Sequence, residues 1–183
     1  MILKKGIPGL FNAHVLTIQD LADRCLGSAS GGRPTDSIRR SIVTKALSAT
    51  DDAGRSLYNF FGESVAFEGF QELAVEAVRE FKASLLSVPE FERRAQRLLK
   101  DDVFMAKFRD FSILIKRYDA RLAELGLSEQ DDEISIAEVL SDEARPELVI
   151  FDGFYHYTRS QAKLVTLVSG WARRTVVTLT QDR

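Results

Sequence analysis

Apolar residues change their spacing twice along the chain. From Thr35 to about Leu140 they recur every three or four positions, which is the period of amphipathic helices. Short apolar or β-branched stretches without that period stand on either side, at 14–17, 148–152 and 175–180. The pattern therefore predicts an α/β protein in which three short strands, forming a small parallel sheet, bracket a large helical region.

Capping signals predict where the first helices begin. The segment from Thr17 to Asp20 (T-I-Q-D) can cap a helix whose apolar residues recur at helical spacing up to Leu26. Gly27 to Pro34 is rich in glycine and serine and is expected to be a flexible link. A second helix follows Thr35, with one apolar stripe formed by Ile38, Ile42, Val43, Ala46 and Leu47.

Further stop and start signals follow in the helical region. Pro89 closes a strong apolar stripe, and a shorter helix is expected from Glu90 to Lys100. Asp101 or Asp102 caps a long helix that ends at Gly126.

The acidic segment from Ser128 to Glu133 is expected to be an exposed loop, because it lacks the glycine and spacing of a calcium-binding loop. A last short helix is expected to start at Ser135, and Pro146 ends the helical region.

The stretch from Glu147 to Gln161 organises the rest of the chain. Leu148 to Phe151 are apolar without alternation, which predicts a strand buried on both faces, as in parallel sheets. Asp152 is expected where this strand ends, and ligands of open α/β sheets gather at the carboxyl ends of strands. Thr158 to Gln161 (T-R-S-Q) is a capping-box pattern that predicts a helix running to about Gly170.

Composition narrows the class of protein. The 183 residues suit one domain, or one domain with a subdomain, and 45% hydrophobic content supports a packed core. A formal net charge of −2 argues against strong nonspecific nucleic-acid binding by the whole surface, so any DNA contact needs a local patch of positive charge.

Cys25 is the only cysteine, which excludes an internal disulfide and favours a reducing, cytoplasmic location. No apolar run approaches the ~20 residues of a membrane-spanning helix, and no secretory signal is evident.

The apolar run followed by Asp152-Gly153 resembles the Walker B motif of P-loop ATPases, in which an Asp orders Mg²⁺ and a following Glu prepares the attacking water. The form I-F-D-G-F…Y-T-R-S-Q is similar to the helicase-like region of the AddB family, whose members are subunits of the bacterial ATP-dependent helicase/nuclease. That region is a degenerate, UvrD-like superfamily 1 helicase fold that has lost ATPase chemistry. The resemblance is sharp over about residues 147–182 and continues more loosely back to His14.

The resemblance implies a domain organisation and partners. Residues 1–33 and 141–183 would form part of a RecA-like lobe, with the Leu148 strand between the other two, and residues 34–140 an inserted helical subdomain. It implies a motor helicase/nuclease subunit of the AddA type as partner, single-stranded DNA as a candidate ligand, and a role in DNA repair and recombination. The chain resembles an excised piece of a longer protein.

Two sequence features argue against catalysis. No Gly-Lys pair of a P-loop occurs in the chain, and Gly153 has no side chain where the Walker B glutamate would stand. We therefore expect no catalytic residue, no metal site and no binding of ATP or Mg²⁺. Asp152 keeps two interpretations, a relic of the nucleotide site or the start of a structural Asp-Gly turn.

Four residues are candidates for DNA contact. Thr17 follows the first expected strand, as a threonine does in the superfamily 1 helicases that this segment resembles. Arg93, Arg97 and Lys100 fall on one helix face, which is either a phosphate-contacting patch or a solvated face paired with nearby glutamates. His14 and His156 have no partner acid or nucleophile at a motif spacing and are taken as surface residues.

Three hypotheses for function remain open. The first is a non-catalytic, helicase-like domain of an AddB-type subunit that provides scaffold and single-stranded DNA contacts during double-strand break resection. The second is a truncated ATPase lobe of an active superfamily 1 helicase. The third is a helical protein-interaction module without DNA binding.

Overall fold

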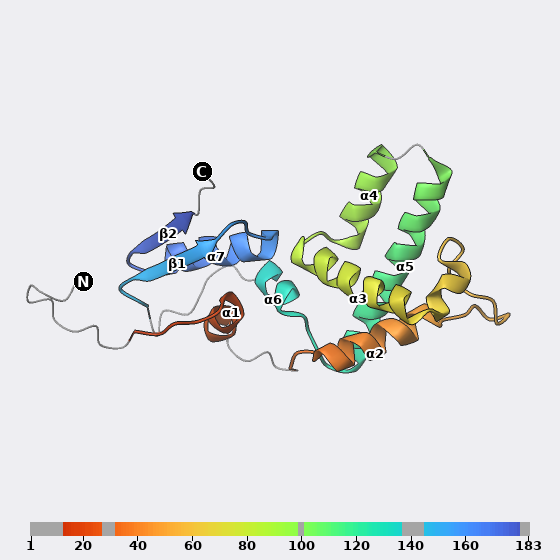
Figure 1. Ribbon diagram of the computed structural model, residues 1–183, viewed down its shortest axis with the longest axis horizontal. Helices are drawn as coiled ribbons and strands as arrows, with labels where there is room; N and C mark the ends of the chain where they lie inside the picture. Colours follow the sequence, from red (N-terminus) through yellow and green to blue (C-terminus); the bar gives the residue numbers. More distant parts are fainter. Residues whose placement is uncertain (1–12, 27–31, 99–100, 137–144, 180–183) are drawn as a thin grey trace, which may run out of the picture.

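The computed structural model describes residues 13–26, 32–98, 101–136 and 145–179, and it is mostly helical with a small parallel sheet (Figure 1). A helical body stands at one end of the molecule and a strand–helix–strand unit at the other, with α1 and α6 beside that unit. In order, the elements are α1 (Ile18–Leu26), α2 (Asp36–Leu47), the 3-10 helix η1 (Gly62–Ala66), α3 (Glu68–Ala83), α4 (Val88–Leu98), α5 (Asp102–Glu124), α6 (Gln130–Ile136), β1 (Val149–Phe154), α7 (Arg159–Trp171) and β2 (Thr175–Leu179). The α/β class with a large helical part is therefore confirmed.

The sheet has two strands in the described part of the chain, and the expected strand at 14–17 is wrong. Residues 14–17 have no regular secondary structure, and Val15 is fully exposed. A strand needs a neighbour that pairs its backbone groups, and this segment has none among the described residues. The expectation that the Leu148 strand lies between those at 14–17 and 175–180 is wrong as well, because within the described residues β1 pairs with β2 alone.

β1 and β2 are parallel, as predicted, but β1 is not buried on both faces. Phe151 is 4% exposed and packs toward α7, whereas Ile150 on the opposite face is 57% exposed. The strand also continues to Phe154, so Asp152 lies within β1 and not at its end. The pairing is irregular between Phe151 and Phe154, where Gly153 adopts a φ of +79° that favours glycine.

The predicted helix starts are confirmed by their capping hydrogen bonds. The Thr35 side chain accepts from the backbone N–H of Ile38 at the start of α2. Asp101 accepts from two backbone N–H groups at the start of α5, and Gly126 lies just past its end with a φ of +66°. α3 ends before Pro89, and that proline falls in the first turn of α4, where its missing N–H costs nothing.

The acidic segment is helical, so the expected loop from Ser128 to Glu133 is wrong beyond Glu129. α6 begins at Gln130, five residues before the predicted start at Ser135, and the rest of that expected helix lies outside the described residues. Two causes outweigh the polar sequence. Ile134 is buried against α7, and three carboxylates in the first turn interact favourably with the positive end of the helix dipole.

Two hydrophobic cores hold the fold together. The larger lies among α2, α3 and α5, and the smaller joins α1, α6, β1 and α7. The smaller core consists of Ala22, Ile134, Phe151, Leu164 and Val168. No helix in the described ranges has both the length and the apolar character needed to cross a membrane.

Candidate functional site

Asp152 lies on the face of the sheet that α7 does not cover. Its carboxylate is exposed and accepts a hydrogen bond from the hydroxyl of Thr178 on the neighbouring strand β2. The same hydroxyl lies 3.4 Å from the carbonyl oxygen of Phe151. The side chain of Asp152 is thus attached to the second strand of the sheet, one residue before Gly153.

The loop after β1 is aromatic. The rings of Phe154 and Tyr157 are stacked with centroids 4.9 Å apart, and Tyr155 between them is 74% exposed. Thr158 then starts α7 with the predicted capping box, in which its hydroxyl accepts from the N–H of Gln161 and its own N–H donates to the Gln161 side chain. The local sequence therefore fixes where α7 begins, directly after the strand that carries Asp152.

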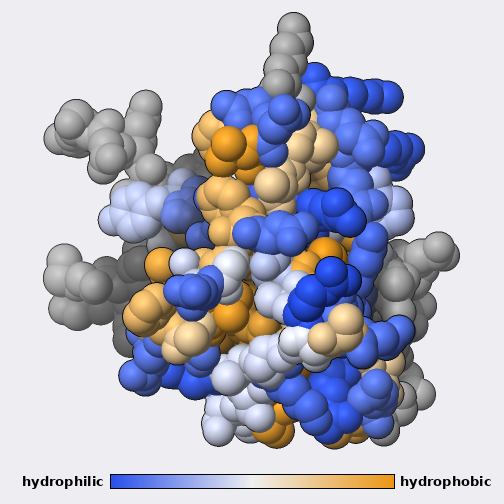
Figure 2. Space-filling model, turned by 90° about the vertical axis from the view of Figure 1, so that its right-hand side faces the viewer, coloured by the Kyte–Doolittle hydropathy of each residue, from blue (hydrophilic) through white to orange (hydrophobic). Residues whose placement is uncertain are grey.

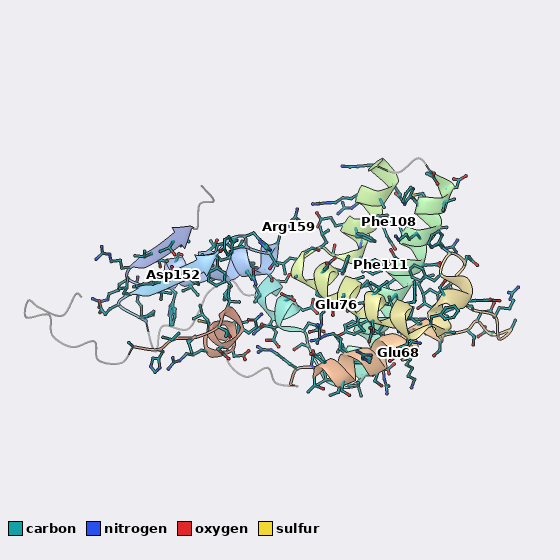
Figure 3. The ribbon with its side chains drawn as sticks, viewed as in Figure 1. Glu68, Glu76, Phe108, Phe111, Asp152 and Arg159 are labelled. Carbon is teal, nitrogen blue, oxygen red and sulfur yellow. The ribbon has the colours of Figure 1, made fainter. Side chains whose placement is uncertain are left out.

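The start of α7 faces the helical body across a cavity of about 490 Å³. Figure 3 labels Asp152 on β1 and Arg159 at the start of α7. α7 contacts α3 and α6. The charged side chains that line this junction cavity are Asp36, Arg39, Arg79, Lys82, Glu129 and Asp131, with Ser160 and Gln161 from α7.

Glu129 is the centre of one ion network in this cavity. The guanidinium of Arg39 donates two hydrogen bonds of 2.9 Å to its two carboxylate oxygens, and the hydroxyl of Tyr118 donates a third. Burial alone would raise the pKa of Glu129, but the hydrogen bonds from Arg39 and Tyr118 outweigh burial and lower that pKa. Burial and the bond to Glu129 raise the pKa of Tyr118. Glu129 is therefore a buried carboxylate that stays ionised.

Lys82 is the centre of a second network. Its side chain is 8% exposed, and its Nζ lies 2.6 Å from Asp119 and 2.9 Å from Asp132. Burial would lower the pKa of Lys82, but the two carboxylates raise it overall. Nearby, burial raises the pKa of Asp131, and a hydrogen bond with Ser160 of α7 offsets this only in part. These networks join α2, α3, α5 and α6 at the junction, and their ionised groups are already paired with one another.

The structure places Thr17 apart from Arg93 and Arg97. Thr17 is occupied as the cap of α1, because its hydroxyl donates to Asp20 Oδ2 over 2.7 Å and accepts from the Asp20 N–H. α1 lies beside the strand–helix–strand unit, whereas α4 belongs to the helical body (Figure 1). Arg93 and Arg97 are exposed on α4, and Lys100 lies outside the described residues.

Pairing with Glu90 is found for a neighbouring arginine of α4, but Arg93 and Arg97 pair with neither Glu90 nor Glu92. Glu90 pairs with Arg94, and Glu92 pairs with Lys116 of α5 at 2.8 Å. Within the described ranges, neither Arg93 nor Arg97 contacts a carboxylate. Arg93 Nε donates to the carbonyl oxygen of Pro89 over 3.4 Å, and the other guanidinium N–H groups are available to an external anion.

The remaining candidates are the two histidines and the cysteine. His14 is exposed and lies 3.5 Å from Arg24, and His156 is exposed in the loop after β1. Cys25 is half-buried beside the smaller core, where burial raises the pKa of its thiol. Within the described residues, no group of three or more His, Cys, Asp or Glu side chains could hold a metal ion.

Sequence reasoning missed the buried charges. Asp110 is fully buried in α5, and its carboxylate accepts hydrogen bonds from the backbone N–H groups of Asn59, Phe60 and Phe61. The available signal was an aspartate between the inward-facing Phe108 and Phe111 of an apolar stripe. Glu129 and Lys82 had no such signal, because their partners are far away in sequence.

A parallel strand–helix–strand unit with an acidic residue on its first strand, joined to a larger helical body, defines an α/β protein with a large helical part. A family model described as "ADDB, N-terminal" matches residues 1–183, so this chain belongs to the AddB N-terminal family. Two relatives are named as the B-type subunit of an ATP-dependent helicase/deoxyribonuclease, one from Thermoanaerobacter sp. (strain X514) and one from Thermoanaerobacter pseudethanolicus (strain ATCC 33223 / 39E). Each is 26% identical to this chain over 174 residues. The matches cover 93% of this chain and 15% of each relative, so the chain spans a small part of their length.

Proposed function

We propose that this chain is a non-catalytic, helicase-like domain of an AddB-type helicase/nuclease subunit. The observation that carries the proposal is the pair Asp152-Gly153 on a parallel strand, followed by the capped helix α7, in a member of the AddB N-terminal family. Nucleotide hydrolysis on such a strand needs a carboxylate that holds Mg²⁺ and a second one that positions water. Here the second of these positions is Gly153. The first is Asp152, whose carboxylate already accepts a hydrogen bond from the hydroxyl of Thr178.

The proposal extends to the larger assembly. The relatives are named as subunits of an ATP-dependent helicase/deoxyribonuclease, which supports a partner subunit of the AddA type. We place the domain in the cytoplasm, in the resection of double-strand breaks for recombinational repair, as scaffold and as a surface for single-stranded DNA. Residues 1–33 and 141–183 would form the partial RecA-like lobe and residues 34–140 its helical insertion.

Two surfaces support contact with single-stranded DNA. Arg93 and Arg97 on α4 contact no carboxylate in the described part of the chain, so they can neutralise phosphates. Tyr155 presents an exposed ring after β1, on which a base can stack. We keep Thr17 as a proposed DNA contact because it lies beside the strand–helix–strand unit that carries Tyr155, although its hydroxyl caps α1.

The test of DNA contact is fluorescence anisotropy of a labelled oligothymidylate at several salt concentrations. Replacing Arg93 and Arg97 together by alanine should weaken binding and reduce the slope of log K against log salt by about 1.4, since each phosphate contact on a single strand contributes about 0.7. Lys45→Ala, a cation on α2, is the matched control and should change neither quantity. An unchanged slope in the double variant would remove α4 from the DNA-contacting surface.

The test of the missing catalysis uses the same protein. We expect no ATP hydrolysis above the blank, with or without oligothymidylate and Mg²⁺. Asp152→Asn should leave that rate unchanged. Hydrolysis that depends on Asp152 would contradict the non-catalytic assignment and favour an active ATPase lobe.

A further inference from the structure

A groove of about 380 Å³ lies between α4 and α5, in the helical body and away from the junction cavity. Figure 3 places Phe108, which lines the groove, at the opposite end of the molecule from Asp152. Figure 2, which views the helical end of the molecule, shows apolar side chains running between hydrophilic ones. The groove is lined by the apolar Ala95, Met105, Ala106 and Phe108 and by the polar Asn59, Glu92, Gln96, Arg109 and Ser112.

The unpaired charge in the lining of the groove is positive. Arg109 lines it, is exposed, and contacts no carboxylate in the described ranges. The carboxylate of Glu92 is neutralised by Lys116 at 2.8 Å. The complementary ligand is therefore acidic.

The lining favours an apolar side chain over a nucleic-acid base. Base stacking needs an open aromatic face, and the ring of Phe108 is already stacked on Phe91, with centroids 4.9 Å apart and planes at 25°. Aliphatic and thioether groups of Ala95, Met105 and Ala106 form the rest of the apolar wall. The volume is near the lower end of the range for small ligand sites and accepts roughly one or two large side chains.

We propose that the groove between α4 and α5 binds an acidic peptide of a partner protein. An apolar side chain of that peptide fills the space beside Met105 and Phe108, and a carboxylate pairs with Arg109. This site is independent of the proposed DNA contacts and of the missing ATPase chemistry.

The test measures binding of a fluorescein-labelled hexapeptide, four aspartates followed by isoleucine and phenylalanine, to the whole chain. We expect saturable binding that Arg109→Glu weakens at least about tenfold, because it replaces attraction by repulsion. Lys45→Glu makes the same charge change on α2, outside the groove, and should stay within about twofold of the parent. Ala106→Trp fills the groove and should also abolish binding, with its folding checked by circular dichroism.

Control peptides identify what is recognised. A hexapeptide with lysines in place of the aspartates, and one ending in two serines, should both fail to bind. The proposal is overturned if no saturable binding occurs up to about 1 mM peptide, the weak limit of specific recognition, or if Arg109→Glu binds as well as the parent.

A nucleic-acid ligand gives a different result. If oligothymidylate displaces the peptide and Arg109→Glu weakens DNA and peptide equally, the groove is a DNA site and the peptide proposal is wrong. If the Arg93 and Arg97 double variant alone loses DNA while peptide binding depends on Arg109, both the proposed function and this inference stand.

Discussion

At the scale of single residues, the buried charges decide the geometry of the junction. Glu129, with Arg39 and Tyr118, is a buried carboxylate whose negative charge is stabilised by three hydrogen bonds. Removing one partner of such a set leaves the others buried and unpaired, which costs far more than a surface ion pair. The sequence contains no local sign of this arrangement, since Arg39 and Glu129 are 90 positions apart.

The charge of Glu129 makes stability depend on pH. Its pKa in the folded protein lies below its ordinary value of 4.5, so it stabilises the fold above about pH 4.5 and loses this contribution as pH falls through the folded pKa. We expect Glu129→Gln to lower the free energy of unfolding by about 3 kcal/mol at pH 7. The difference from the parent should shrink below pH 4, as the parent's carboxylate becomes protonated.

Urea unfolding at pH 7 and at pH 3.5 measures both differences. Glu63→Gln, an exposed glutamate of η1, is the matched control and should stay within about 0.5 kcal/mol of the parent at either pH. If Glu129→Gln lowers the free energy of unfolding equally at both pH values, the substitution disturbs packing and not charge.

At the scale of elements, the signals that could be predicted from the sequence are local ones. The caps at Thr17, Thr35, Asp101 and Thr158 each act over three residues, and all four are present in the structure. The failures are elements whose state depends on distant partners. Residues 14–17 have strand-forming side chains but no paired strand among the described residues, and α6 is helical because Ile134 reaches a distant core.

The same distinction applies to the candidate site. The start of α7 could be placed from the sequence because its cap follows the strand directly, whereas Asp152 was expected at the end of β1 and lies within it. The junction cavity and the groove between α4 and α5 could not, because each is formed by elements from several parts of the chain.

The cap of α7 gives a prediction at this scale. Thr158→Ala removes the hydroxyl that accepts from the Gln161 N–H and should cost about 1 kcal/mol. For a chain of this size that corresponds to a fall in Tm of about 2–4 °C, measured by calorimetry. Thr166→Ala, in the middle of the same helix, is the control and should leave Tm unchanged or slightly raised, because alanine favours helix. Equal losses in the two variants would show that the cap contributes nothing specific.

At the scale of the whole molecule, the two ends differ in how well they are covered. The helical body surrounds a continuous core, whereas the sheet is covered on one face by α7 and open on the other. The open face carries Ile150 and Val176, which are paired across the two strands, together with Leu148. Exposed apolar strands of this kind are sites of association.

We therefore expect the chain in isolation to self-associate through the sheet. Ile150→Lys should reduce association, because it places a charge in the middle of the open face, and size-exclusion chromatography with light scattering would measure it. Leu73→Lys introduces the same charge at an exposed leucine of α3 and should have no effect. Dissociation by Leu73→Lys alone would locate the contact on the helical body.

The irregular pairing at Gly153 has a consequence for engineering. A positive φ at this position means that a glutamate placed there would force a side chain into a backbone conformation that L-residues rarely adopt. Building a water-activating carboxylate at position 153 would thus require a change in the path of the strand as well as the exchange of one amino acid.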